Sequence, residues 1–369
     1  MPQGGFYDLL LWLVLLTVFA YVSREIDILR TIKEIEAYIE GFKRATQKAL
    51  DTTLEEFKSV AKRVRNPYDV KELEQRVKDM VESVLIEPVS RDPYGLMDKL
   101  KHLILVEDAA LTDEIRSLVP MASDVEVENL KDLIEATRQL NYIYKYVDHY
   151  YRLGKKFKSL WLLLQLQSLL PFLVEEVSAL ESSLEAFSKG FPIGDSVGCL
   201  VAAKFIHLYG KGEPVEVAKE TIVSKAEFKG REVIVIKAKG PSGVTGRLDD
   251  ALTMAIKGGK RPKVIITVDA ALKLEGERTG TVIDGIGVAI GGLGVEKFNI
   301  EKIATKLGIP LYAILIKMSG PEALSVMCKE VALSAERALK RVERVIEERS
   351  EKGDTVVLIG VGNSIGVAP

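Results

Sequence analysis

The chain has 369 residues, with 51 Lys or Arg and 53 Asp or Glu, which gives a formal net charge of −2 at pH 7. This near-neutral balance excludes the strongly basic class of nucleic-acid-binding proteins, so we predict no nucleic-acid partner. The two cysteines and three histidines show no CxxC or HExxH spacing, which excludes a disulfide framework and a classical zinc site.

The first predicted element is an uncharged apolar segment, residues 9–22. Roughly 20 apolar residues cross a bilayer, so this segment has nearly spanning length. No Lys or Arg precedes it, whereas Arg24, Arg30 and Lys33 follow it, and the positive-inside rule then places the bulk of the chain in the cytoplasm. We predict a single-pass transmembrane anchor over residues 1–23 in the cell membrane. A buried core helix is the alternative.

Residues 24–189 carry helical signals almost throughout and are predicted to form an all-α region. Apolar residues recur at three- and four-residue steps with charges between them, at Ile26, Leu29, Ile32, Ile35 and Ile39. This pattern predicts a stalk or coiled coil as far as about Arg65, through which the chain would form a homo-oligomer.

The segment 159–174 is apolar and uncharged, but it contains Gln165, Gln167 and Pro171. Polar residues and a proline suit a core or interfacial helix better than a membrane span. A second crossing is the alternative, and it would move the C-terminal domain out of the cytoplasm.

After Gly190, strands, glycine turns and helices alternate. Such alternation predicts an α/β domain over residues 190–369, with a mostly parallel sheet covered by helices on both faces. The predicted strands are residues 232–237, 264–269, 311–316 and 355–359. The predicted helices are residues 197–209, 247–257, 300–307 and 321–349.

The strand VIITVDAA, residues 264–271, is continuously apolar up to Asp269. Ligands of open α/β sheets gather where strands end, so this carboxylate is a candidate for chemistry. Gly-rich segments lie on both sides of it, at residues 240–246 and 285–294. Backbone that approaches a ligand closely, or that needs a positive φ, favours glycine.

Four segments, GPSGVTGRLDDALTMAI, PKVIITVDAA, GTVIDGIGVAIGGLGV and LGIPLYAILI, together resemble the spore germination protease and hydrogenase maturation peptidase group. Those enzymes begin with a strand that ends in Gly-x-Gly-Asn, followed by a loop with an acidic residue and glycine. Here the matching strand, residues 356–363, closes the chain, and the matching loop, residues 194–198, opens the domain. The resemblance implies a circularly permuted domain with a phosphorylase/hydrolase-like fold. The whole chain also resembles an archaeal membrane-anchored family known as domain of unknown function 1512, which implies no activity.

The peptidase resemblance implies that Asp195 and Asp269 are the catalytic acids and that the substrate is a protein or peptide. Two carboxylates in one cleft can share a proton, one acting as base for water and the other as acid, or can hold a divalent cation. Simpler roles stay open from the residues alone, since Asp195 can cap the next helix and Asp269 can hold the glycine loop. No histidine occupies a matching position, so nickel is not expected.

The remaining candidates surround this acid pair. The predicted ligand-binding loop residues are Gly194, Gly240, Gly243, Gly246, Gly291, Gly292, Gly362 and Asn363. Additional candidate acids are Glu275, Glu277 and Asp284, for which solvated loop charges are the alternative. A second function class also remains open: a non-catalytic membrane scaffold or sensor that oligomerises through its helices and binds a small ligand or protein partner with the α/β domain.

Overall fold

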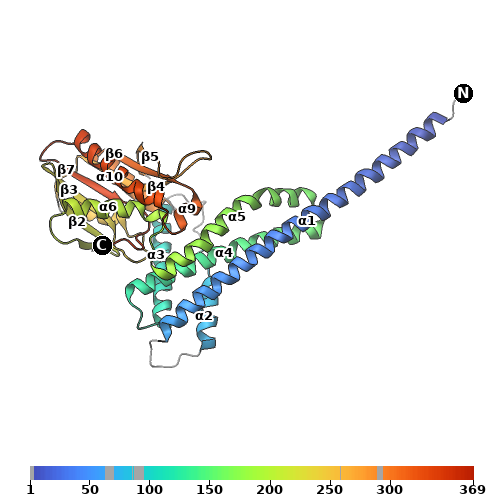
Figure 1. Cartoon of the computed structure of the whole chain (residues 1–369), viewed down its shortest axis with the longest axis horizontal. Helices are drawn as coiled ribbons and strands as arrows, with labels where there is room; N and C mark the ends of the chain where they lie inside the picture. Colours follow the sequence, from blue (N-terminus) through green and yellow to red (C-terminus); the bar gives the residue numbers. More distant parts are fainter. Residues whose placement is uncertain (1–3, 63–69, 85, 87–94, 258, 289–293) are drawn as a thin grey trace. The chain divides into compact units, whose positions relative to one another are not determined.

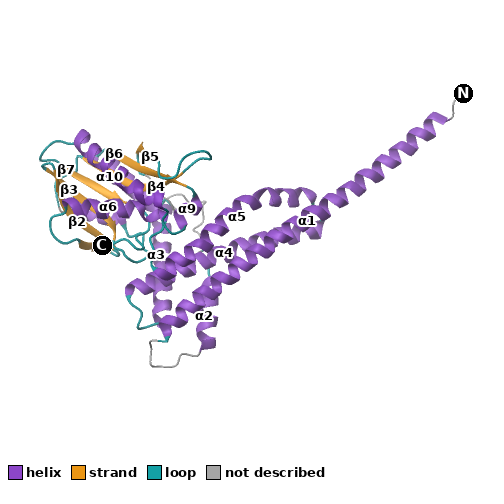
Figure 2. Ribbon diagram, viewed as in Figure 1, coloured by secondary structure: helices purple, strands orange, loops and turns teal. Residues whose placement is uncertain are grey.

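The computed structural model describes residues 4–62, 70–84, 86, 95–257, 259–288 and 294–369 (Figures 1 and 2). Two of the predicted loop residues, Gly291 and Gly292, lie outside this set, as does the predicted end of the stalk near Arg65. The chain divides into two compact units. Unit 1 comprises Met1–Lys48 and Gln139–Ser178, and unit 2 comprises Ala49–Arg138 and Ala179–Pro369.

The described part of the predicted all-α region is helical. Its helices are α1 (Gly4–Ala61), α2 (Val70–Glu82), α3 (Leu96–Leu118), α4 (Asp124–Phe157) and α5 (Leu160–Lys189). Two of them, α1 and α5, are long and apolar enough to cross a membrane by length and composition. The apolar run at residues 9–22 of α1 is exposed throughout. The predicted apolar N-terminal helix is therefore present, and its insertion into a membrane stays a prediction.

Unit 1 is a bundle of α1 as far as Lys48, α4 from Gln139 onward and α5 as far as Ser178 (Figure 1). Its buried apolar residues include Ile28, Ile35, Ile39, Phe42, Leu140, Ile143, Val147, Leu163, Leu166 and Leu170. Thr46 Oγ1 donates to the carbonyl of Leu140 over 3.1 Å, and Gln139 Nε2 donates to Glu176 over 2.9 Å. Of the predicted apolar stripe of α1, Ile35 and Ile39 are thus buried inside unit 1, whereas Ile26 and Leu29 are exposed. Oligomer formation stays a prediction.

Unit 2 contains a seven-stranded sheet with the order β1-β2-β3-β7-β4-β6-β5. The strands are β1 (Val215–Ala218), β2 (Thr221–Phe228), β3 (Arg231–Ala238), β4 (Val264–Leu272), β5 (Val282–Ile286), β6 (Leu311–Met318) and β7 (Thr355–Gly360). The four predicted strands correspond to β3, β4, β6 and β7, which pair in parallel at the centre. The edge strands β1, β2 and β5 pair antiparallel. The predicted α/β architecture is confirmed and its four predicted strands are parallel, but the antiparallel edge strands make the sheet mixed.

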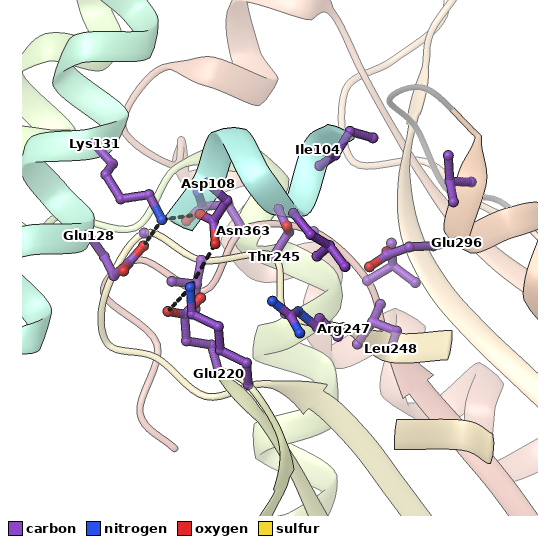
Figure 3. Close-up of a pocket in the computed structure, with 18 of the residues that line it drawn as sticks. Ile104, Asp108, Glu128, Lys131, Glu220, Thr245, Arg247, Leu248, Glu296 and Asn363 are labelled. Atoms are coloured by element: carbon purple, nitrogen blue, oxygen red, sulfur yellow. Dashed lines mark hydrogen bonds and ion pairs between the residues drawn. The ribbon is translucent and has the colours of Figure 1, made fainter. Parts of the chain in front are cut away.

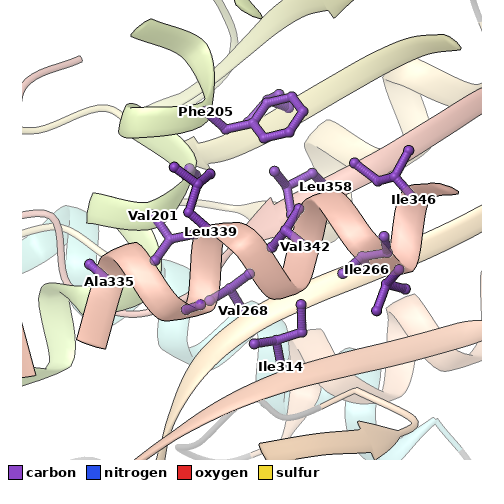
Figure 4. Close-up of a cluster of buried hydrophobic side chains, with 14 of the residues drawn as sticks. Val201, Phe205, Ile266, Val268, Ile314, Ala335, Leu339, Val342, Ile346 and Leu358 are labelled. Carbon is purple, nitrogen blue, oxygen red and sulfur yellow. The ribbon is translucent and has the colours of Figure 1, made fainter. Parts of the chain in front are cut away.

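Helices cover both faces of the sheet, as predicted. On one face lie α6 (Val197–Tyr209) and α10 (Lys329–Arg349), and on the other α7 (Leu248–Lys257) and α8 (Val295–Leu307). Successive side chains of a strand point to opposite faces of the sheet. Val268 therefore packs with α6 and α10, while Ile265 packs with α7 and α8. Figure 4 shows Leu339 and Val342 of α10 over this sheet, beside Val201 of α6.

The predicted helix over residues 321–349 is two helices. The first, α9 (Gly320–Leu324), starts at a capping box in which Ser319 and Glu322 exchange side-chain and backbone hydrogen bonds. The second is α10. Between them, the backbone of Met327 donates to the carbonyl of Pro192 over 2.7 Å, so the break in the helix ties this segment to the loop that precedes Asp195.

Strand β4 is longer than predicted, because it continues past Asp269 to Leu272. Its pairing with β7 ends at Val268 opposite Gly360, whereas its pairing with β6 continues to Leu272. Asp269 therefore lies at the first position of β4 that has lost its β7 neighbour. Because β7 ends here, the centre of the sheet has an opening beside Asp269, and the candidate site lies at this opening.

Candidate functional site

A cavity of about 640 Å³ lies at the end of β4 and β7 in unit 2. Its lining includes the first residues of α7 and α8, the end of β7 and parts of α3 and α4. Figure 3 draws 18 of the lining residues and labels ten, among them Glu128, Lys131, Glu296 and Asn363. Crevices at the carboxyl ends of parallel strands are the usual ligand sites of α/β sheets.

Asp195 lines this cavity from a short 3₁₀ turn, η1 (Gly194–Ser196), that leads into α6. Its Oδ2 accepts a hydrogen bond from the backbone N–H of Asn363 over 2.8 Å. Helix α6 has Ser196 at its N-cap without a side-chain capping bond, so the alternative role of Asp195 as a helix cap is not observed. Burial raises the pKa of this carboxyl, and the Asn363 N–H opposes that shift.

Asp269 lines the same cavity from β4 and is 6% exposed. Its Oδ1 accepts from the backbone N–H of Ala270 over 2.7 Å. Burial, with a smaller effect from the Asp195 charge, raises the pKa of Asp269 to about 8. The structure thus brings the two predicted acids to one cavity and within electrostatic reach of each other. Their catalytic role stays a prediction.

A third acid in the cavity, Asp132, comes from α4 and was not among the predicted site residues. Burial raises the pKa of its carboxyl well above the ordinary value. Asn363 Nδ2 lies 3.5 Å from Asp132 Oδ2, so Asn363 contacts both Asp132 and Asp195. In the sequence, Asp132 is one of many charges on an amphipathic helix, and only the tertiary packing distinguishes it.

The predicted loop glycines divide into two groups. Gly243, Gly246 and Gly362 line the cavity, whereas Gly194 and Gly240 do not. A Cβ at Gly243 would lie 1.6 Å from Asp132 Oδ2, and a Cβ at Gly362, which has φ +107°, would lie 2.1 Å from the Asp195 carbonyl. These glycines therefore make room for the acids of the site. Gly194 and Gly240 instead allow close packing against the carbonyls of Glu322 and Val367.

The additional candidate acids lie outside the cavity lining. Asp284 pairs with Arg341 over 3.1 Å, and Glu277 pairs with Lys317 over 3.3 Å. Glu275 is exposed in the loop after β4. The structure therefore favours ordinary surface roles for these residues.

The buried Lys131 and the partly buried Lys101 neutralise part of the acidic lining. Lys131 lies between Asp108 and Glu128, as Figure 3 shows. Lys101 Nζ contacts Asp249 over 2.7 Å and Asp250 over 2.9 Å, and Asn299 Nδ2 also donates to Asp249.

Two further carboxyls of the cavity, those of Glu220 and Glu296, have raised pKa values. Burial, reinforced by neighbouring acids, raises the pKa of Glu220 and of Glu296 to about 7 each. The cavity therefore gathers several carboxyl groups that can hold protons near neutral pH.

In the part of the chain that the structure describes, no set of side chains matches the predicted divalent-cation site. Within those residues, no three His, Cys, Asp or Glu side chains lie close enough together to hold a metal ion. Asp195 and Asp269 alone offer two side chains, and each has one oxygen engaged by a backbone N–H.

Fold and site together define a two-part protein, with a helical N-terminal half and a mixed α/β domain that carries an acidic cavity. The family model described as "Protein of unknown function (DUF1512) N-terminal domain" matches residues 9–190, and "Domain of unknown function (DUF1512) C-terminal" matches residues 193–368. The chain belongs to the DUF1512 family. No curated protein matches it.

Proposed function

We propose that the α/β domain is an aspartate-dependent hydrolase of peptide bonds, with Asp195 and Asp269 as its acid pair. The observation that carries this proposal is the convergence of both carboxyls on one cavity, with the pKa of Asp269 raised to about 8. Two carboxyls with separated proton affinities are the usual basis of acid–base hydrolysis.

In this proposal Asp269 acts as the general acid and Asp195 as the general base. Asp269 keeps its proton at neutral pH and donates it to the carbonyl oxygen of the scissile bond. Asp195, whose ionised form accepts the Asn363 N–H, takes a proton from the attacking water. The water oxygen bonds to the carbonyl carbon to give a tetrahedral intermediate with two hydroxyl groups. As the C–N bond breaks, the proton held by Asp195 passes to the leaving amine, and one hydroxyl returns its proton to Asp269 as the C=O bond forms again.

The direct test is peptide hydrolysis by the full-length protein in lipid nanodiscs, with a random peptide library read by mass spectrometry. The wild type should cleave a subset of peptides, and Asp195→Asn and Asp269→Asn should each lower the rate by about 100-fold or more. Asp284→Asn is the matched control, since it removes an acid outside the cavity, and it should keep the wild-type rate. Wild-type protein without cleavage, or equal cleavage in all variants, would favour the scaffold or sensor function.

We also propose that α1 anchors the protein in the cell membrane, with the bulk of the chain in the cytoplasm. The fully exposed run at residues 9–22 supports this, because such a surface is unfavourable in water. The basic residues that follow the run support the orientation. Protease added outside right-side-out vesicles should then leave the α/β domain intact, and its digestion would contradict this topology.

A further inference from the structure

We propose that the tip of the α4–α5 hairpin lies in the phospholipid headgroup region beside α1. We call the surface formed by Phe157 and Trp161 of this tip, together with Ile26 and Leu29 of α1, the collar. The inference rests on the proposed anchoring of α1. All collar residues belong to unit 1, so their placement depends only on contacts within that unit.

The first step is the level of the hairpin tip along α1. Lys158, in the turn between α4 and α5, pairs with Glu25 over 3.5 Å, and nine residues further on Gln167 contacts Glu34. Helix α5 therefore runs parallel to α1 with equal residue steps. The tip lies at Glu25, three residues after the apolar run ends at Val22.

The second step is the surface at this level. Phe157 is 66% exposed and Trp161 is 70% exposed, and Ile26 and Leu29 of α1 are also largely exposed. Aromatic side chains gather where a membrane protein meets the headgroups, because one part of the ring is apolar and the surroundings are wet. An exposed apolar group next to an apolar helix therefore fits a lipid interface.

The third step is charge. Lys155, Lys156 and Arg30 are exposed near the collar, and Lys156 Nζ lies 5.5 Å from the centre of the Phe157 ring. Long basic side chains at membrane ends extend toward headgroups and attract anionic lipids. The collar thus combines the aromatic and basic groups that an anionic phospholipid surface binds.

The same register argues against a second crossing by residues 159–174. A bilayer around this part of α5 would also enclose the neighbouring part of α1, which carries Arg30, Lys33 and Glu34. Charged side chains in the hydrocarbon cost several kcal/mol each. Contact of the hairpin tip with the interface explains the apolar face of α5 without this cost.

The two tryptophans of the chain, Trp12 and Trp161, make the test specific. Trp161 is the sole tryptophan in Trp12→Phe, and Trp12 is the sole tryptophan in Trp161→Phe. Each full-length variant is placed in phosphatidylcholine–phosphatidylglycerol vesicles whose acyl chains carry bromine either near the headgroup or near the terminal methyl. Fluorescence quenching then reports the contact of each tryptophan with lipid.

We expect Trp161 to lose emission with bromine near the headgroup and to lose clearly less with bromine near the terminal methyl. Quenching of Trp12 without quenching of Trp161 would overturn the collar and leave the anchor intact. Absence of quenching for both tryptophans would overturn the anchor as well. Shielding of Trp161 from iodide that rises with protein concentration, without bromolipid quenching, would identify a second copy of the chain as the occupant and contradict the inference.

Discussion

The Asp195 Oδ2 atom accepts a hydrogen bond from the Asn363 backbone N–H over 2.8 Å, although 168 positions separate the two residues. This contact joins the loop that opens the α/β domain to the segment that follows β7 at the end of the chain. Gly362 makes the approach feasible, because its φ of +107° and missing Cβ leave room for the Asp195 carbonyl. The site therefore depends on both ends of the domain.

The contact between Gly243 and Asp132 predicts a steric cost for any larger residue. Gly243→Ala would place a Cβ 1.6 Å from Asp132 Oδ2, so the Asp132 carboxyl must leave its position or the loop and helix α4 must shift. We expect a loss of roughly 1–3 kcal/mol in the free energy of unfolding, measured by chemical denaturation.

Two variants isolate this collision. Adding Asp132→Ala to Gly243→Ala removes the colliding carboxylate and should restore most of the lost stability. Gly320→Ala, at a position with open space around it, should change stability little. Equal losses in Gly243→Ala with and without Asp132 would contradict the proposed contact.

Lys101 is the cation that neutralises Asp249, an acid that is 3% exposed. Lys101→Ala leaves this buried carboxylate without its ion pair, and we expect a loss of about 3 kcal/mol in unfolding free energy. Asp249→Asn in the same chain should recover part of that loss. Lys189→Ala breaks an exposed pair with Glu185, which solvent screens, and should change the unfolding free energy far less. If Lys101→Ala lowers the unfolding free energy as little as Lys189→Ala does, the ion pair between Lys101 and Asp249 does not stabilise the fold as proposed.

Lys237 is fully buried and holds the end of the chain. Its Nζ donates to the carbonyls of Ala238 and Ala368, over 3.0 and 2.8 Å, and burial lowers its pKa. Lys237→Met should free the terminal residues, so that carboxypeptidase removes them faster than in the wild type, as read by intact mass. Lys239→Met, which breaks the surface pair with Glu216, is the control. Identical truncation of both variants would contradict the role of Lys237.

The raised pKa of Asp269 predicts a pH-dependent stability. Between the ordinary carboxyl value and about pH 8, the native state holds a proton on Asp269 that the unfolded state has lost. The unfolding free energy therefore falls as pH rises through this window, and ionised Asp269 destabilises the fold. In Asp269→Asn the fall should be smaller, by on the order of a few kcal/mol over the window. Unfolding free energies are measured by chemical denaturation from pH 5 to pH 9. An equal fall with pH in the variant and in the wild type would disprove this prediction.

The sequence predicts the central strands better than the edges. Residues 264–268 of β4 and Thr355–Gly360 of β7 are largely apolar and buried on both faces, and such runs are easily assigned. Thr221–Phe228 alternates buried and exposed residues and pairs antiparallel with β3. Because polar residues occupy its exposed positions, the sequence of this strand is hard to distinguish from that of a turn. The mixed character of the sheet was missed for this reason.

The sequence likewise indicates some residues of the candidate site and not others. Asp269 stands out because an ionisable residue follows an apolar run, and Asp195 stands out through the peptidase resemblance. Asp132 lies on a helix in which charged residues are frequent, so nothing local distinguishes it. Its place in the cavity comes from the packing of α4 beside the Gly243 loop, a contact between segments more than 100 residues apart.

The central claim is that Asp269 is a protonated acid at neutral pH, held so by burial and by the charge of Asp195. Infrared difference spectroscopy of the full-length protein in nanodiscs tests it through the carbonyl stretch of protonated carboxyl groups. The wild type should carry a component at pH 7 that disappears as the pH rises through about 8, that is missing in Asp269→Asn, and that disappears at lower pH in Asp195→Asn. A spectrum and pH dependence unchanged in Asp269→Asn would contradict the claim.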